Sequence, residues 1–166
     1  MNTLLKVTPE QVESLIGTPE RAVDLVRDLL WAEAVRQGVN PLRISVSDKI
    51  YSKDGGVDGT TIEISPKKEG LLFQGVTYYQ IKWGKTFDPR KGTKVRKELL
   101  TKNNNLRAKL KALAKKKGTY VLVWFGGSFV GNENETCIEI IKNIFNKGYS
   151  KVKVFVIDPI FRTLIL

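Results

Sequence analysis

Hydrophobic and polar residues follow two different periods along this chain, and the period of each segment predicts whether it folds as a helix or as a strand. The first helical pattern has Thr18 as a candidate N-cap, Pro19 at the first helical position and Gly38 at its end. A second pattern is interrupted by three asparagines at 103–105. The segments with a helical period are residues 19–37, 93–118 and 133–148.

Five other segments are rich in β-branched and aromatic residues, and glycine or proline turns separate several of them. The predicted strands are residues 42–50, 60–65, 76–83, 119–127 and 151–157. A glycine-rich turn at 52–59 joins the first two strands, so that three consecutive strands form a short meander. The resulting order is α-β-β-β-α-β-α-β, which predicts an α/β domain with a mixed central sheet flanked by helices.

The composition narrows the class of protein further. With 166 residues, 42% of them hydrophobic, the chain is long enough for one domain with its own core, spanning residues 1–166. Its apolar runs are too short to cross a bilayer, and its N-terminal residues do not resemble a signal peptide, so we expect a cytoplasmic protein with no membrane partner. The apolar end at 161–166 leaves open whether the chain is the N-terminal module of a longer protein.

Two residue counts exclude several kinds of catalysis. The chain contains no histidine and a single cysteine, Cys137. Serine–histidine and cysteine–histidine triads, histidine-based zinc hydrolases and cysteine-rich zinc sites are therefore excluded. Any catalysis has to use carboxylates, lysine, arginine or a metal ion that is bound by oxygen ligands.

The net charge of +11 is concentrated in one segment. Residues 85–117, which we call the basic segment, hold 13 basic and 2 acidic residues, whereas the rest of the chain holds 15 of each. A local block of this kind is typical of proteins that bind nucleic acid through its phosphates, although a solvated helix surface is the plainer alternative. We expect DNA to contact Lys85, Arg90, Lys91, Lys94, Arg96, Lys97, Lys102, Arg107 and Lys109.

The predicted strand 76–83 carries polar residues that a buried strand does not need. Gln80 and Lys82 are two positions apart, so their side chains lie on the same face of the strand. Asp58 follows the glycine turn and, if the two strands pair as in a hairpin, can lie beside Gln80. An aspartate, an amide carbonyl and a lysine form a coherent site for Mg²⁺ or Mn²⁺, in which the lysine orients water or stabilises a developing negative charge.

A further acidic residue is a candidate for this site. On a helical wheel Glu33 lies about 20° from Val26, near the centre of the apolar stripe of the first helix. A core-facing glutamate is costly unless it is paired or binds metal. Glu33 is therefore either a third metal ligand or half of a structural ion pair, for example with Arg43 or Lys82.

The sequence "DGGVDG…YYQIKWGK" resembles the PD-(D/E)xK nuclease superfamily, and within it the Mrr-like branch of restriction endonucleases, in which glutamine replaces the glutamate of the motif. The resemblance implies a restriction-endonuclease-like αβββαβ core and a metal-dependent DNA endonuclease. It assigns Asp58 as the acid of the motif, Gln80 as the residue at the glutamate position and Lys82 as the motif lysine. Glu33 would correspond to the helix-borne acid of many members.

Two alternatives to this hypothesis remain open. The same fold and basic segment would also suit a DNA-binding module that does not cleave, or a nuclease of the Holliday junction resolvase type. The resemblance further implies a role in restriction or antiviral defence. It leaves open whether the chain acts as a homodimer or larger oligomer and whether a sensor module is fused to it or associated with it.

Overall fold

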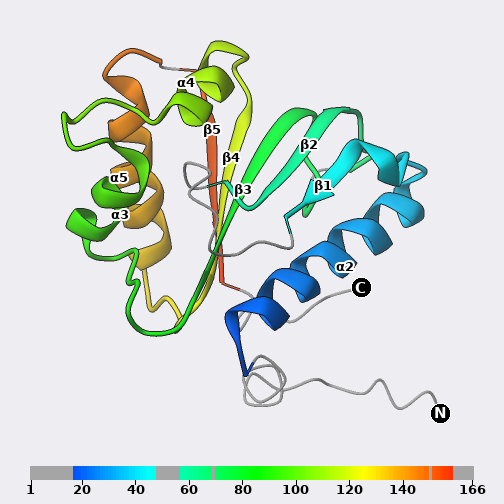
Figure 1. Ribbon diagram of the computed structural model, residues 1–166, viewed down its shortest axis with the longest axis horizontal. Helices are drawn as coiled ribbons and strands as arrows, with labels where there is room; N and C mark the ends of the chain where they lie inside the picture. Colours follow the sequence, from blue (N-terminus) through cyan, green and yellow to red (C-terminus); the bar gives the residue numbers. More distant parts are fainter. Residues whose placement is uncertain (1–16, 48–56, 69, 150, 159–166) are drawn as a thin grey trace.

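The computed structural model describes residues 17–47, 57–68, 70–149 and 151–158 (Figure 1). The described helices are α2 (Pro19–Gln37), α3 (Gly92–Leu99), α4 (Ala108–Lys115) and α5 (Glu133–Asn146), with a 3-10 turn η1 (Pro41–Arg43). The described strands are β1 (Ile44–Val46), β2 (Gly59–Ile64), β3 (Gly75–Trp83), β4 (Thr119–Phe125) and β5 (Lys153–Ile157).

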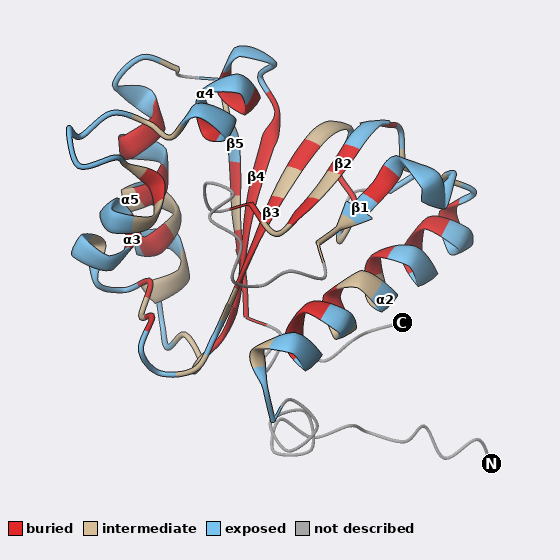
Figure 2. Ribbon diagram, viewed as in Figure 1, coloured by how far each residue is buried: buried red, intermediate tan, exposed pale blue. Residues whose placement is uncertain are grey.

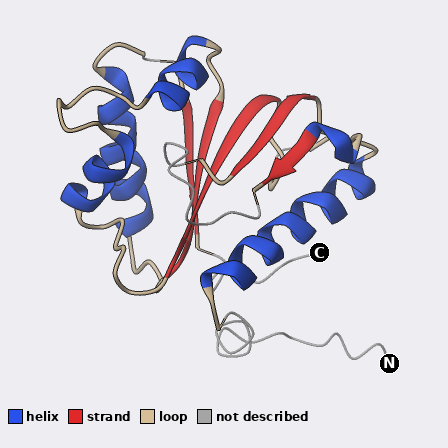
Figure 3. Ribbon diagram, viewed as in Figure 1, coloured by secondary structure: helices blue, strands red, loops and turns tan. Residues whose placement is uncertain are grey.

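The strands form one mixed sheet in the order β1-β2-β3-β4-β5. The pairs β1–β2 and β2–β3 are antiparallel, and the pairs β3–β4 and β4–β5 are parallel. Helix α2 covers one face of the sheet, and α3, α4 and α5 lie on the other face (Figure 3). The predicted α/β class with a mixed sheet between helices is confirmed.

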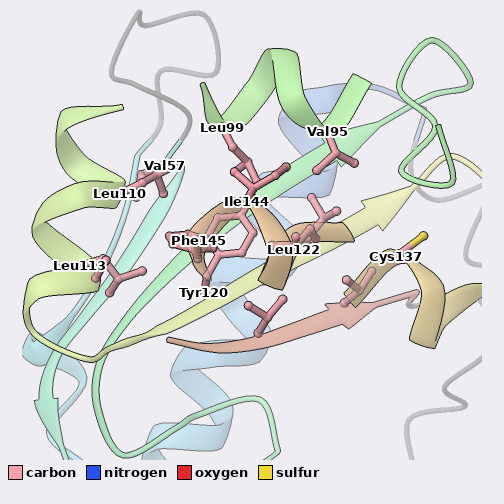
Figure 4. Close-up of a cluster of buried hydrophobic side chains, with 14 of the residues drawn as sticks. Val57, Val95, Leu99, Leu110, Leu113, Tyr120, Leu122, Cys137, Ile144 and Phe145 are labelled. Carbon is pink, nitrogen blue, oxygen red and sulfur yellow. The ribbon is translucent and has the colours of Figure 1, made fainter. Parts of the chain in front are cut away.

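The alternation of side chains along the strands divides the buried residues into two cores, one on each face of the sheet (Figure 2). Tyr79 and Ile81 of β3 pack in the core under α2. Tyr120 and Leu122 of β4 pack in the core under α3, α4 and α5 (Figure 4). Trp124 of the same strand belongs to this core as well. Every residue of β4 is buried because helices cover both of its faces, which is typical of the parallel part of a sheet, whereas β3 is only partly buried.

The first helix begins and ends as its sequence predicts. The Thr18 hydroxyl accepts a hydrogen bond of 3.3 Å from the Arg21 amide, and Pro19 occupies the first turn. Gly38 ends the helix with a φ of 69°, a left-handed conformation that glycine adopts without strain. The apolar residues of α2 between these two ends pack in the core on one face of the sheet.

A turn at residues 101–105, which we call the asparagine turn, separates two short helices, α3 and α4. The Thr101 amide donates to the Asn105 carbonyl at 2.8 Å, and Asn104 has a φ of 57°. A β-bridge between Leu100 and Leu106 closes the turn. The chain thus reverses between the helices, and both pack against the same core.

Some predicted boundaries differ from the observed ones. The predicted strand 42–50 begins with the turn η1, because Pro41 at its first position favours a tight turn, and β1 covers only Ile44–Val46 of it. Parts of three predicted segments lie outside the described residues: the end of the first strand at 48–50, residues 52–56 of the glycine turn, and the apolar end at 161–166. Within the residues that the structure describes, no helix is long and apolar enough to cross a membrane.

Replacing Gly118 by alanine tests how closely the turn between α4 and β4 packs against α4 and β3. A Cβ atom at this position would lie 2.3 Å from Leu113 Cδ1 and 2.7 Å from the Val76 carbonyl oxygen. Because the added methyl group has no room, we expect Gly118→Ala to lower the free energy of unfolding by about 1–3 kcal/mol. Urea unfolding measures this change. The control is Gly148→Ala, whose Cβ meets nothing within 4 Å, and an equal midpoint for both variants would contradict the prediction.

Candidate functional site

Asp58 lies directly before β2, where the antiparallel pairing of β2 with β3 positions it. Gly59 is paired with Tyr79 in the ladder, so Asp58 stands beside Gln80 on the next strand. Its amide donates to the Tyr79 carbonyl at 2.8 Å, and its carboxylate accepts a hydrogen bond of 2.7 Å from the Ile81 amide. The structure therefore brings Asp58 next to Gln80, as the sequence predicts.

Gln80 and Lys82 both face α3 and share one acceptor. Gln80 is buried, and its Nε2 donates to Glu98 Oε2 at 3.1 Å. Lys82 Nζ donates to the same Glu98 oxygen at 2.7 Å and lies 5.5 Å from the centre of the Phe87 ring. The Gln80 carbonyl oxygen accepts a hydrogen bond from the Tyr120 hydroxyl. Polar residues from β3, α3 and β4 thus form one connected cluster.

Glu98 belongs to this site although no motif in the sequence predicts it there. It lies in the last turn of α3, next to the buried positions Val95 and Leu99 on the helix surface. It is also one of only two acidic residues in the basic segment. Glu98 is the one acidic residue of the cationic helix α3, and it lies beside the apolar stripe of that helix. This position is the sequence signal that points to Glu98 as a partner for Lys82.

Tyr120 links the two carboxylates of the cluster electrostatically. Burial raises the pKa of its hydroxyl well above the ordinary value, and the negative charges of Glu98 and Asp58 raise it further. Both carboxylates therefore lie close enough to Tyr120 for their charges to act on it. The cluster as a whole combines Asp58, Gln80, Lys82, Glu98 and Tyr120, and we call it the polar cluster.

The oxygen donors of the polar cluster are of the kind that hard divalent cations prefer. Mg²⁺ and Mn²⁺ prefer oxygen ligands, and Mg²⁺ usually binds one or two carboxylates together with water and substrate oxygens. Asp58 and Glu98 supply two carboxylates, whereas one lone pair of the Gln80 carbonyl already accepts a hydrogen bond from Tyr120. Because no group of three acidic, histidine or cysteine residues gathers in the described ranges, water or substrate would complete the coordination there.

The structure does not bring Glu33 to the polar cluster. Glu33 lies on α2, on the opposite face of the sheet from Gln80 and Lys82. Its carboxylate accepts hydrogen bonds of 2.8 and 2.7 Å from Arg36 and one from Gln37. The Arg36 guanidinium holds the pKa of Glu33 below its usual value. The geometry therefore favours the structural ion pair, with Arg36 as the partner.

Arg90, which the sequence predicts to contact DNA, has partners within the protein. Its guanidinium lies 2.8 Å from Asp88 and 3.5 Å from Glu133, and 5.5 Å from the centre of the Trp124 ring. The guanidinium holds the pKa of the Asp88 carboxyl below its usual value. Arg90 thus joins the loop after β3 to the start of α5 and is a less suitable phosphate contact than its exposure suggests.

Arg107 also has a structural role, whereas the other predicted DNA contacts are exposed. The Arg107 side chain donates to the carbonyl oxygens of Glu98 at 2.6 Å and Lys97 at 3.1 Å, which are among the last carbonyls of α3. Apart from Arg90 and Arg107, the members of the set are Lys85, Lys91, Lys94, Arg96, Lys97, Lys102 and Lys109, and all of these are exposed. They lie on the loop before α3, on α3 itself, on the asparagine turn and on α4.

Comparison with known proteins adds no assignment: no family model, curated protein or solved structure matches this chain. The chemistry of the polar cluster therefore has to be inferred from its own geometry. Two carboxylates, a lysine and a cationic helix lie on one face of the sheet, and this arrangement suits a substrate that carries phosphate.

The raised pKa of Tyr120 makes stability dependent on pH. A tyrosine in the unfolded chain ionises near pH 10, whereas Tyr120 in the folded protein keeps its proton to higher pH. The stabilisation is therefore present below about pH 10 and is lost at up to about 1.4 kcal/mol per pH unit above it. We expect urea midpoints measured from pH 9 to pH 11 to fall less steeply for Tyr120→Phe than for the parent. Equal slopes would contradict this prediction.

Proposed function

We propose that this protein is a metal-dependent DNA endonuclease that hydrolyses phosphodiester bonds. The observation that carries the proposal is the polar cluster, in which Gln80 and Lys82 donate to Glu98 of the basic segment and Asp58 lies beside Gln80 on the neighbouring strand. The element order from α2 to β4 agrees with the restriction-endonuclease-like core that the resemblance implies. It therefore supports the assignment of this domain to that class of fold.

Asp58 and Glu98 would hold the metal ion, Mg²⁺ or Mn²⁺. A bound ion would supply a Lewis acid that neutralises charge on the phosphate and lowers the pKa of the attacking water. Lys82 is close enough to Glu98 to stabilise negative charge that develops next to the carboxylates. Gln80 is fully buried and fixes the Glu98 carboxylate through its amide, so its role is to position that ligand.

The basic segment would supply the affinity for DNA. Lys94 and Lys97 are exposed on α3, the helix that carries Glu98, so phosphates that they bind lie near the polar cluster. Contacts of this kind depend on charge and not on base sequence. Together with the resemblance, these contacts lead us to propose a cytoplasmic enzyme of restriction or antiviral defence. It would act as a homodimer or larger oligomer, or together with a sensor module.

One observation favours a second candidate, a module of the same fold that binds DNA without cleaving it. The Gln80 carbonyl accepts a hydrogen bond from Tyr120, and the charge of Lys82 is balanced by Glu98. A cluster whose polar groups bind one another can be a structural network that requires no metal. Metal-dependent cleavage separates the two candidates.

Plasmid nicking by purified variants tests the proposed endonuclease. We expect the parent to nick supercoiled DNA with Mg²⁺ or Mn²⁺ and not with EDTA. Asp58→Ala, Lys82→Ala and Glu98→Gln should each reduce the rate by about 100-fold or more, because each removes a charged group from the site of reaction. DNA binding should change little, since the lysines and arginines of the basic segment remain in place.

Glu33→Gln is the matched control, because it removes a carboxylate that lies on the other face of the sheet. It should nick DNA at the parental rate. If Lys82→Ala or Glu98→Gln cleaves as fast as the parent, the polar cluster is not the active site. If the parent binds DNA and no metal supports cleavage, the non-cleaving module is the correct alternative.

The salt dependence of DNA affinity tests the role of α3. Each phosphate contact that is lost should reduce the slope of log affinity against log salt by about 0.9. We therefore expect the double variant Lys94→Glu/Lys97→Glu to reduce the slope by about two and to weaken binding to any duplex. The double variant Lys67→Glu/Lys151→Glu, with the same change of charge outside the basic segment, should keep the parental slope. Equal slopes for both double variants would show that α3 does not contact DNA.

A further inference from the structure

A pocket separate from the polar cluster opens between the ends of two helices. It lies between the end of α3, the asparagine turn, α4 and the end of α5, and its volume is about 310 Å³. Sites for small ligands commonly begin at about this size. None of the described residues of the polar cluster lines this pocket.

Hydrogen bonds fix two walls of the pocket. One wall is the asparagine turn, which the bond from the Thr101 amide to the Asn105 carbonyl and the bridge between Leu100 and Leu106 hold in place. The other wall is the end of α5, where the Tyr149 amide donates to the Phe145 carbonyl at 3.0 Å. The pocket is thus largely formed before any ligand binds, which lowers the entropic cost of binding.

The pocket attracts negative charge. Arg96, Lys111 and Lys147 line it from three different helices or helix ends, and the described lining contains no acidic residue. The C-terminal ends of α3 and α5 oppose this charge with about half an elementary charge each. Three full positive charges exceed that sum, so the potential in the pocket stays positive.

The rest of the lining is suited to a flat ring with polar edges. Leu106 and Tyr149, which are half-buried, provide an apolar and partly aromatic surface, and the side chains of Asn104 and Asn105 offer amide donors and acceptors. A free phosphate would need only the cations, and an apolar ligand would need only the apolar surface. A ligand that uses all three features carries a planar base and a phosphate.

We propose that this pocket binds a nucleotide, either as a free mononucleotide or as an unpaired nucleotide of a bound strand. Aromatic and apolar side chains stack on bases irrespective of sequence, and cations bind the phosphate. The site goes beyond the proposed endonuclease. Arg96 and Glu98 are two positions apart on α3, about 200° around its axis, so the nucleotide contacts the helix that carries Glu98 without entering the polar cluster.

Isothermal titration calorimetry with AMP, without divalent metal, tests the proposal independently of cleavage. We expect saturable binding with a dissociation constant below about 1 mM. Lys111→Glu should weaken binding about tenfold or more, whereas Lys67→Glu, the same change of charge outside the pocket, should leave it unchanged. Asn104→Gly should also weaken it, since glycine keeps the backbone conformation at φ 57° and removes only the amide.

Two competitors identify the source of the nucleotide and its essential part. If a short single-stranded oligothymidylate displaces AMP, and its own binding needs Lys111, the nucleotide comes from a strand; if only AMP binds, it is a free nucleotide. If inorganic phosphate displaces AMP with a dissociation constant equal to that of AMP, the base contributes nothing to binding and the proposal is overturned. Absence of saturable AMP binding, or equal weakening by Lys111→Glu and Lys67→Glu, would overturn it as well.

Discussion

A lysine on the middle strand of a sheet needs an opposite charge close by, because an unpaired ammonium that is partly removed from water is costly. The side chain of Lys82 is only 24% exposed, and the charge it needs comes from Glu98 on α3. The same carboxylate oxygen also accepts a hydrogen bond from the buried Gln80 amide. One acidic side chain thus satisfies two polar groups of β3 and fixes how α3 lies on the sheet.

The chain after α3 also helps to hold Glu98 in the position in which it pairs with Lys82. Glu98 lies in the last turn of α3, and Arg107 returns to donate a hydrogen bond of 2.6 Å to its carbonyl oxygen. Both the side chain and the main chain of this residue are therefore held, the first by β3 and the second by the start of α4. The asparagine turn makes this return possible, because it reverses the chain within a few residues. The Lys82–Glu98 pair and the Arg107 hydrogen bond thus both help to hold α3 and α4 on the same core.

The sequence predicts those features that depend on short-range pattern. The helices and strands follow from their periods, and the position of Asp58 beside Gln80 follows from the register of a meander. Glu98 is not predicted, because its bond to Lys82 joins residues 16 positions apart through a helix whose rotation is set by packing. The wheel correctly places Glu33 on the buried side of α2, yet a period cannot tell which face of the sheet a helix covers. The pairing of Glu33 with Arg36 joins residues only three positions apart, but a helical wheel predicts which residues are buried and not which residues they pair with.

Strand β3 separates a half of the sheet with antiparallel neighbours from a half with parallel neighbours, and this has a consequence for folding. Antiparallel strands can pair through a short connection, so β1, β2 and β3 make contacts that are close in sequence. Parallel pairing of β4 with β3 has to wait for the crossover through α3 and α4, which closes a longer loop. Asp58, Gln80 and Lys82 lie in the antiparallel half, and Glu98 is only 16 residues from Lys82, whereas Tyr120 is 40 residues from Gln80. We therefore expect the bond from Tyr120 to Gln80 to be the last of the polar cluster to form, because it has to wait for the non-local pairing of β4 with β3.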